Sequence, residues 1–192
     1  MSEAQPAPTG PAAPQRPRIT FLVVGVVLAA VLGVGLFTTL GSPKDGVPAV
    51  GSAAPSFSLA RLAGKGATVG TPADGGGAGK PVVLVFFASW CPPCRSEMPA
   101  LAAAYRAQSG ARRVAVIGVD GMDPTGKALA FVHASGVTFP VAADPDFQVT
   151  EGLYFFTGDP DAVFINGNGT IVHIARGPIT RSQLLEWERR LS

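Results

Sequence analysis

Residues 82–94 have the sequence VVLVFFASWCPPC, a continuous apolar run followed by two cysteines three positions apart. A short, wholly apolar run predicts a strand that is buried on both faces. Beyond the second cysteine, Met98, Leu101, Ala102 and Tyr105 recur at the spacing of one helix face. We therefore expect the cysteines where a buried strand meets the start of a helix.

A C-x-x-C pair at a helix start is suited to redox chemistry. The free N–H groups and partial positive charge of a helix N-terminus favour a thiolate on the first sulfur, that of Cys91. Cys94 lies one turn further and can attack a mixed disulfide made by Cys91. We expect Cys91 to be the exposed nucleophile and Cys94 the buried resolving thiol, with Trp90, Pro92 and Pro93 shaping the site.

Other uses of this cysteine pair are less well supported. A zinc site needs two further ligands, and the two histidines, His133 and His173, fall in a predicted helix and a predicted strand far along the chain. A haem attachment site needs histidine directly after the second cysteine, where Arg95 stands. A structural disulfide between residues three apart closes too short a loop to contribute much stability.

The rest of the domain alternates strand and helix signals. Asp123-Pro124 is expected to be an N-cap followed by proline at the first helical position, and Gly136 to end that helix. The other expected elements up to residue 153 are strands at 114–119 and 137–142 and a short helix around 147–153.

Residues 163–166 and 170–175 flank a Gly-Asn-Gly turn and predict a hairpin. Thr180 and Gln183 fit a capping box at the start of a last helix, whose buried side would be formed by Leu184, Leu185, Trp187 and Leu191. These elements predict an α/β fold, a mixed central sheet flanked by helices.

The amino-terminal third differs in composition. Residues 1–18 are proline-rich and predict a disordered tail. Residues 19–40 carry no charge and would span roughly 33 Å as a helix, which predicts a transmembrane anchor. A signal peptide cleaved near Ala49 is the alternative. Arg16 and Arg18 precede the span, so the tail is expected in the cytoplasm and the domain outside the cell membrane.

Residues 41–54 are expected to be a flexible linker and residues 55–192 the folded domain. From residue 50 onward the chain has twelve Lys or Arg and eleven Asp or Glu. A near-neutral domain argues against a nucleic-acid partner.

The chain resembles the TlpA/ResA/CcmG (DsbE) group of membrane-anchored, extracytoplasmic thioredoxin-like proteins. The most specific match is Trp90-Cys91-Pro92-Pro93-Cys94-Arg95-Ser96-Glu97-Met98-Pro99, and weaker matches are APSFSL at residues 54–59, KPVVL at 80–84 and DP with VFINGNG between 159 and 169. The resemblance implies a thioredoxin-like fold, with the strand and helix that these proteins insert lying within residues 125–153.

The resemblance also implies roles for three residues near the cysteines. Pro160 would be a cis-proline beside the disulfide, where substrate backbone pairs. Glu97 would be a partly buried acid that relays protons to the thiols, the alternative being a solvated helix carboxylate. Thioredoxin has an aspartate for this task where Val85 stands here. The residues on both sides of Pro160 depart from the family pattern: Asp159 precedes it and Asp161-Ala162 follow it. The family's substrate preference therefore does not transfer to this loop.

The expected function is reduction of protein disulfides outside the cytoplasmic membrane. By resemblance, the substrates would be apocytochrome c disulfides and the electrons would come from a membrane donor of the CcdA/DsbD type, with no cofactor beyond the disulfide. Pro92 and Pro93 have no N–H to stabilise a thiolate. Glu97 and Asp159 add negative charge, which disfavours the thiolate, and Arg95 opposes this effect. The balance predicts a reducing couple. The alternatives are an oxidase or isomerase, a copper-binding chaperone, and a peroxidase, whose Thr-x-x-Cys setting is lacking.

Overall fold

The computed structural model describes residues 46–71, 79–108 and 114–191 of the chain. The predicted tail and membrane anchor, residues 1–18 and 19–40, lie outside these ranges. Within them, no helix is both long and apolar enough to cross a membrane. The described helices and strands all belong to one compact unit that begins at Gly46.

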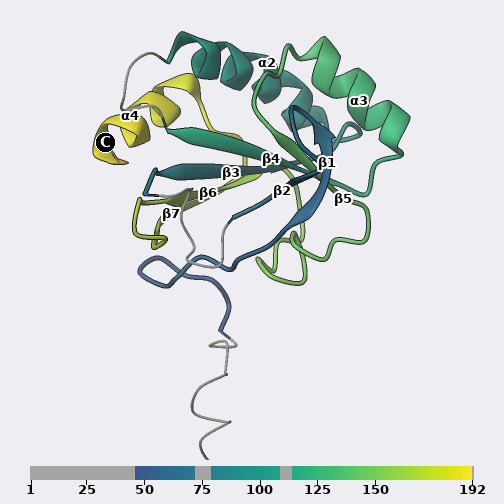
Figure 1. The fold of residues 1–192 in the computed structure, drawn as a ribbon. Helices are drawn as coiled ribbons and strands as arrows, with labels where there is room; N and C mark the ends of the chain where they lie inside the picture. Colours follow the sequence, from purple (N-terminus) through teal and green to yellow (C-terminus); the bar gives the residue numbers. More distant parts are fainter. Residues whose placement is uncertain (1–45, 72–78, 109–113, 192) are drawn as a thin grey trace, which may run out of the picture. The chain divides into compact units, whose positions relative to one another are not determined.

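The described residues form a seven-stranded mixed sheet with the strand order β2-β1-β5-β4-β3-β6-β7 (Figure 1). The central strands β3, β4 and β5 are parallel, whereas β6 is antiparallel to β3 and β7 is antiparallel to β6. At the other edge, β1 is antiparallel to both β5 and β2. The strands are β1 Leu59–Ala63, β2 Thr68–Val69, β3 Val82–Phe87, β4 Ala115–Gly121, β5 Val141–Asp144, β6 Asp161–Ile165 and β7 Ile171–Arg176.

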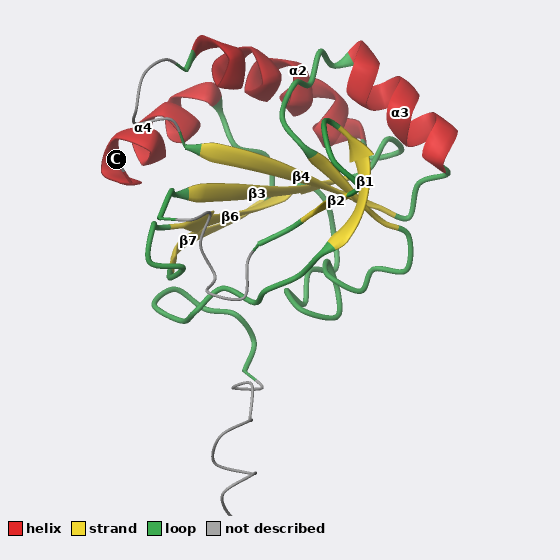
Figure 2. Ribbon diagram, in the orientation of Figure 1, coloured by secondary structure: helices red, strands yellow, loops and turns green. Residues whose placement is uncertain are grey.

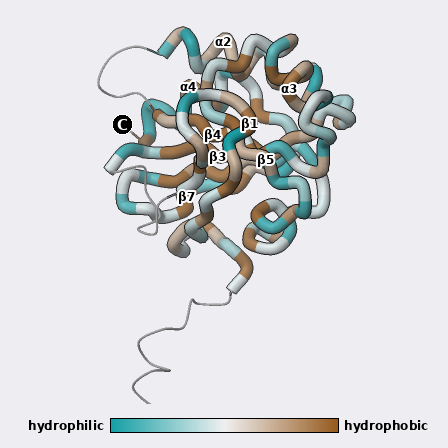
Figure 3. Tube along the Cα trace, turned by 45° about the vertical axis from the view of Figure 1, so that its right-hand side comes forward, coloured by the Kyte–Doolittle hydropathy of each residue, from teal (hydrophilic) through white to brown (hydrophobic). Residues whose placement is uncertain are grey.

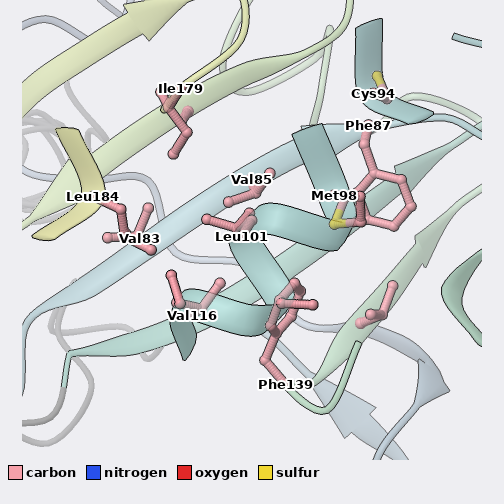
Figure 4. Close-up of a cluster of buried hydrophobic side chains, with 14 of the residues drawn as sticks. Val83, Val85, Phe87, Cys94, Met98, Leu101, Val116, Phe139, Ile179 and Leu184 are labelled. Carbon is pink, nitrogen blue, oxygen red and sulfur yellow. The ribbon is translucent and has the colours of Figure 1, made fainter. Parts of the chain in front are cut away.

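Three described helices cover one face of this sheet (Figure 2): α2 Pro92–Ala107, α3 Thr125–Ala134 and α4 Arg181–Leu191. Because successive strand residues point to opposite faces, Val83, Val85 and Phe87 of β3 pack on the helical side. Figure 4 shows Met98 and Leu101 of α2 within this cluster, with Cys94 above Phe87. Both cysteines therefore belong to the core on the helical side of the sheet.

The opposite face of the sheet is covered by non-helical segments of the described chain. Phe86 of β3 packs there against Tyr154 and Phe156, with ring centroids 5.1 and 4.9 Å apart. In Figure 3 the hydrophobic residues gather where β3 and β4 pass through the centre. The fold is thioredoxin-like α/β with a mixed sheet, as predicted, but its described helices lie on one face only.

The short helix predicted around residues 147–153 is wrong, because this segment forms a series of turns. The Asp144 carboxylate accepts hydrogen bonds from the backbone N–H groups of Val149 and Thr150. Phe147 has a positive φ of 52°, outside the helical region. The Val149 carbonyl accepts hydrogen bonds from the N–H groups of both Leu153 and Tyr154, four and five residues later. This mixed pattern does not continue as a regular α-helix.

Two other boundaries differ from the sequence prediction. Helix α3 has Pro124 as its N-cap rather than at the first helical position, and the Asp123 carboxylate binds Ser89 instead of capping the helix. The strand predicted at residues 137–142 begins only at Val141. Pro140 has no N–H to donate to a sheet, and its carbonyl accepts the N–H of Gly118 at 2.9 Å.

The strand predicted at residues 114–119 is β4, which runs from Ala115 to Gly121. Three other predicted features are confirmed. The hairpin of β6 and β7 turns at residues 166–170, where the Asn166 side chain accepts two backbone N–H groups. Gly136 has φ 66° just beyond the end of α3, the left-handed conformation that glycine adopts at helix ends. Thr180 and Gln183 form the reciprocal capping box of α4.

The segment before residue 55 is attached to the sheet. The N–H groups of Gly51 and Ala54 donate to the carbonyls of Ile171 and Gly169, and the Ile171 N–H donates to Ser52. Ala54 is buried with the core on the non-helical side. The expected linker, residues 41–54, is therefore bound to β7 from Gly51 onward.

Candidate active site

The two cysteines lie where β3 passes into α2, as the sequence predicts. Cys91 is the N-cap of α2 with an extended backbone, φ −80° and ψ 113°. Pro92 and Pro93 occupy the first helical positions, where a missing N–H costs nothing. The Cys94 N–H donates to the Cys91 sulfur at 3.2 Å, so a helix-start donor reaches the sulfur although the two prolines supply none.

Cys91 and Cys94 form a disulfide, with their Cα atoms 5.3 Å apart. Cys91 is only 2% exposed and Cys94 is fully buried. The expectation that the Cys91 sulfur faces solvent is therefore wrong for this disulfide form. The carbonyl oxygen of Asp159 lies 3.5 Å from the Cys91 sulfur, so the loop before β6 lies against it. The neighbouring Trp90 is 55% exposed and marks the surface above the disulfide.

The loop before β6 brings Asp159 and Pro160 to the disulfide. The Asp159–Pro160 peptide bond is cis, which confirms the prediction for this bond. The Pro160 carbonyl accepts the N–H of Gly177, just after β7. Residues of this loop and of the end of β7 line a hollow of about 290 Å³ beside the cysteines: Thr157, Gly158, Asp159, Pro160, Asp161, Arg176 and Gly177.

Glu97 is buried at 7% exposure on α2, one helical turn beyond Cys94. Its Oε1 atom accepts the backbone N–H of Ile179 at 2.8 Å, which links α2 to the segment before α4. Burial raises the pKa of Glu97 to about 7, and this hydrogen bond partly offsets the rise. The solvated-carboxylate alternative is therefore wrong, while the proton relay stays a prediction.

Two further acids belong to the cis-proline loop. Burial raises the pKa of Asp159 to about 6, and the nearby Asp161 and Asp123 raise it further. Burial also raises the pKa of Asp161, but the Gly177 N–H and the Arg176 guanidinium lower it. Arg176 forms an ion pair with Asp161 at 3.1 Å. In contrast to Asp161, Asp159 has no cation among the causes of its pKa shift.

A polar network next to the loop that carries the disulfide is marked by no sequence motif. Both carboxylate oxygens of Asp123 accept hydrogen bonds from Ser89, one from its N–H and one from its hydroxyl. The Ser89 carbonyl accepts the Arg95 Nε–H at 2.8 Å. Asp120 lies nearby, 2% exposed at the end of β4. The signal in the sequence was a charged residue at the end of the otherwise apolar run 114–119.

The histidines lie away from this network. His133 is exposed on α3, and the His173 ring stacks on Trp187 with ring centroids 4.6 Å apart. Burial lowers the pKa of His173, and the positive charge of Arg190 lowers it further. No cluster of three or more His, Cys, Asp or Glu that could hold a metal ion occurs in the part of the chain that the structure describes.

This arrangement can carry out thiol–disulfide exchange. A thiolate at Cys91 can attack a disulfide, and Cys94, buried directly behind it, can then displace the partner sulfur. Two electrons pass to the substrate disulfide, the Cys91–Cys94 bond forms, and the substrate leaves as two thiols. The acids with strongly raised pKa values around this centre are the buried Glu97 and Asp120 and the half-buried Asp159.

Comparison with known proteins agrees with the geometry. Residues 50–174 match the model of the AhpC/TSA family. The chain is 36% identical over 159 residues to the thiol:disulfide interchange protein DsbE homolog of Paracoccus denitrificans, covering 81% of this chain and 83% of that protein. It is 28% identical over 175 residues to the thiol-disulfide oxidoreductase ResA of Bacillus subtilis, covering 90% and 93%.

Solved structures give the same result. A putative thiol:disulfide interchange protein DsbE from Chlorobium tepidum superposes with a TM-score of 0.60 at 32% identity, covering 74% of this chain and 96% of that one. A secreted Mycobacterium tuberculosis disulfide oxidoreductase homologous to E. coli DsbE gives 0.59 at 25% identity, covering 70% and 96%. With its disulfide at the start of α2, the chain belongs to the AhpC/TSA family and is a thiol–disulfide oxidoreductase of the DsbE/ResA type.

Proposed function

We propose that this protein reduces protein disulfides outside the cytoplasmic membrane, with those of apocytochrome c as its substrates. The observation that carries this proposal is the acidic surrounding of the disulfide. Pro92 and Pro93 offer no N–H to the Cys91 sulfur, which leaves the Cys94 N–H as its donor. Glu97 is a buried acid one helical turn beyond Cys94, and the half-buried Asp159 belongs to the loop whose carbonyl contacts the Cys91 sulfur. Negative charge nearby disfavours a thiolate, and a couple whose thiolate is disfavoured is a reductant.

The proposed cycle starts from the reduced protein. The Cys91 thiolate attacks one sulfur of the substrate disulfide, and the other substrate sulfur leaves and takes up a proton. The Cys94 thiol then loses its proton, Glu97 accepting it, and attacks the Cys91 sulfur. The Cys91–Cys94 disulfide forms and the second substrate thiol is released. A membrane dithiol donor of the CcdA/DsbD type returns two electrons and two protons.

The cis-proline loop is the proposed place for the substrate backbone. The Asp159 carbonyl lies 3.5 Å from the Cys91 sulfur, and the hollow lined by residues 157–161 opens beside it. An extended segment on either side of a substrate cysteine can pair with this loop. Trp90, more than half exposed, supplies an apolar surface next to it.

The reduction potential of the Cys91–Cys94 couple tests the direction of the reaction. We expect a value near that of thioredoxin, roughly −270 mV, rather than near that of DsbA, roughly −120 mV. Glu97→Gln and Asp159→Asn should each raise the potential, because each removes a negative charge near the sulfurs. Asp146→Asn removes an exposed carboxylate and is the matched control.

Two results would contradict the proposed direction. One is a couple that stays reduced in a largely oxidised glutathione buffer, together with a Cys91 pKa below about 5. The other is preferential formation of disulfides in a reduced peptide that carries an apocytochrome-type C-x-x-C-H segment. Either result would assign the oxidase or isomerase function instead.

The proposed location rests on residues 19–40 as an anchor, with Arg16 and Arg18 on its cytoplasmic side. The M. tuberculosis relative described above is a secreted protein. Protease added to intact cells stripped of their outer layers should digest the domain while a cytoplasmic marker survives. Protection of the domain, or a mature protein that begins near Ala49, would contradict the anchored extracytoplasmic location.

A further inference from the structure

Asp120 is a buried acid that the exchange mechanism described so far does not use. It is next to last in β4, paired in register with Phe87 at the end of β3. Val114, Val116 and Phe87 all point to the helical side of the sheet, and the alternation along β4 places Asp120 on that side too. It therefore lies on the face that carries the disulfide. Its Oδ1 atom has no hydrogen-bond partner among the described residues.

The Asp120 carboxyl lies within hydrogen-bonding reach of the Asp123 carboxyl, which raises the pKa of Asp120. Two carboxyl groups can share a hydrogen bond only if one of them holds a proton. Both oxygens of Asp123 already accept hydrogen bonds from Ser89, so the hydrogen-bond network assigns the proton to Asp120. The raised pKa of Asp120, about 8, supports this assignment; its causes are burial first and then the neighbouring Asp123 and Asp159.

The pair is connected to the disulfide through the chain. Ser89 is held on one side by Asp123 and on the other by the Arg95 side chain. Only Trp90 separates Ser89 from Cys91, whose N–H donates to the Ala88 carbonyl. If the two hydrogen bonds from Ser89 to Asp123 weaken, the loop that presents the Cys91 sulfur can therefore change position.

We propose that Asp120 is a positioning residue for thiol–disulfide exchange: it holds a proton, donates it in a hydrogen bond to Asp123, and so keeps Asp123 fixed on Ser89 and the Cys91 loop in place. When Asp120 loses this proton, two ionised carboxylates face each other and repel, and the Ser89 loop loosens. The inference rests on the exchange activity, but not on the direction of the reaction or on the protein substrate.

Several other charged groups lie on the elements around Asp120. Of these, Asp123 and Asp159 act on it directly. The charged or titratable residues on the elements of this region are Asp123 and Asp159 in loops, Arg95, Glu97 and Arg106 on α2, Lys127 and His133 on α3 and Asp144 on β5. Asp144 is engaged with Val149 and Thr150, and Glu97 with Ile179.

The test compares Asp120→Asn with the wild type in a Trp187→Phe background, where Trp90 is the remaining tryptophan. Asparagine keeps a donor for Asp123 and cannot ionise. We expect a transition in Trp90 fluorescence near pH 8 in the wild type and none in Asp120→Asn. We expect the rate of the reduced protein with the neutral disulfide 2,2′-dithiodipyridine to be lowered by an ionisation near pH 8, and we expect Asp120→Asn to lack this decrease.

Two further variants distinguish positioning from a purely structural role. Asp120→Leu removes the donor to Asp123 and should slow the reaction at pH 6 by about fivefold, the equivalent of one lost hydrogen bond, of which Asp120→Asn recovers most. Asp146→Asn, an exposed acid, should keep the wild-type pH profile.

A fluorescence transition that persists in Asp120→Asn, or identical rate profiles for this variant and the wild type, would overturn the proposal. If wild-type protein does not react with the disulfide at all, that result counts against the oxidoreductase function. The fluorescence transition, measured on both the oxidised and the reduced protein, still decides the role of Asp120.

Discussion

The two sulfurs of the disulfide differ in their surroundings although both are buried. The Cys91 sulfur lies at the N-cap of α2, 3.5 Å from the carbonyl oxygen of Asp159 in the cis-proline loop. Cys94 is in the first turn of α2, fully buried in the core cluster. A substrate that displaces the loop before β6 therefore reaches Cys91 first.

Cys94→Ser should leave a protein that accumulates mixed disulfides through Cys91, because no resolving thiol remains. Reaction with a disulfide-containing peptide, followed by intact-protein mass spectrometry, measures the adduct. Cys91→Ser is the matched control and should form little adduct under the same conditions. Accumulation in Cys91→Ser instead would reverse the two roles.

Glu97 gives a pH dependence whose sign follows from its burial. Its pKa is raised from 4.5 to about 7 in the folded protein, so the folded state binds the proton more tightly than the unfolded state does. The favourable contribution of this proton is complete below about pH 4.5 and is lost as the pH rises through about 7.

Glu97→Gln keeps an acceptor for the Ile179 N–H but cannot ionise. Between about pH 4.5 and 8 we expect the wild type to lose roughly 2–3 kcal/mol of unfolding free energy relative to this variant. Urea unfolding of both oxidised proteins across this range measures the difference. A difference that stays constant with pH would mean that the Glu97 carboxyl titrates as it does in the unfolded chain.

Short motifs in the sequence identify some residues of the site but not others. The cysteine pair, Glu97 and Pro160 stand in short motifs, and each lies beside the disulfide or one turn from it. Asp120 and Ser89 stand in no motif. Their importance depends on β4 lying beside β3, a contact between residues 33 positions apart in the chain for the pair Phe87 and Asp120.

Among the elements, α4 begins with local chemistry that the sequence predicts. The Thr180 N–H donates to the Gln183 side chain at 2.8 Å, and the Gln183 N–H donates back to the Thr180 hydroxyl at 3.2 Å. Leu184 then packs in the same core cluster as the two cysteines, as Figure 4 shows for Leu184 and Cys94. Because Ile179 directly precedes Thr180 and binds Glu97, the start of α4 also fixes one partner of the buried acid.

Thr180→Ala should lower the unfolding free energy by about 1 kcal/mol, because one amide at the start of α4 loses its acceptor. Urea unfolding measures this loss. Glu186→Ala is the control on the same helix: it breaks the exposed pair with Arg190 and should change stability by less than about 0.5 kcal/mol. Equal effects of the two substitutions would contradict the capping role.

The elements that the sequence misplaces are those decided by a single distant or special contact. β5 starts late because Pro140 has no N–H. Residues 147–153 fail to form a helix where the Asp144 carboxylate binds the backbone N–H groups of Val149 and Thr150. Asp123 caps no helix because Ser89, 34 residues earlier, offers it two donors.

Over the whole described unit, the two faces of the sheet are built differently. The helical face carries the disulfide and is closed by α2, α3 and α4. Apolar spacing predicts the buried sides of α2 and α4, whereas α3 is predicted only from the signals at its two ends. The other face is closed by an irregular segment with Tyr154 and Phe156 and by the chain around Ala54 and Phe57. These segments have no apolar periodicity in the sequence, so their packing position becomes visible only in the folded structure.

The chain before residue 55 gives the last prediction. A protein starting at Gly46 keeps three backbone hydrogen bonds between residues 51–54 and the hairpin of β6 and β7, and keeps Ala54 in the core. A protein starting at Pro55 loses all of them. At about 1 kcal/mol for each hydrogen bond, we expect the shorter protein to be less stable by roughly 2–4 kcal/mol.

Urea unfolding of the two truncated proteins measures this difference, with the disulfide intact in both. Replacing Val47 and Val50 with serine in the longer protein is the control, because both side chains are exposed and neither should matter. Equal midpoints for the two lengths would show that residues 51–54 are a tether after all. A lower midpoint for the shorter protein would place the start of the folded domain at the pairing with β7, ahead of the boundary that composition predicts.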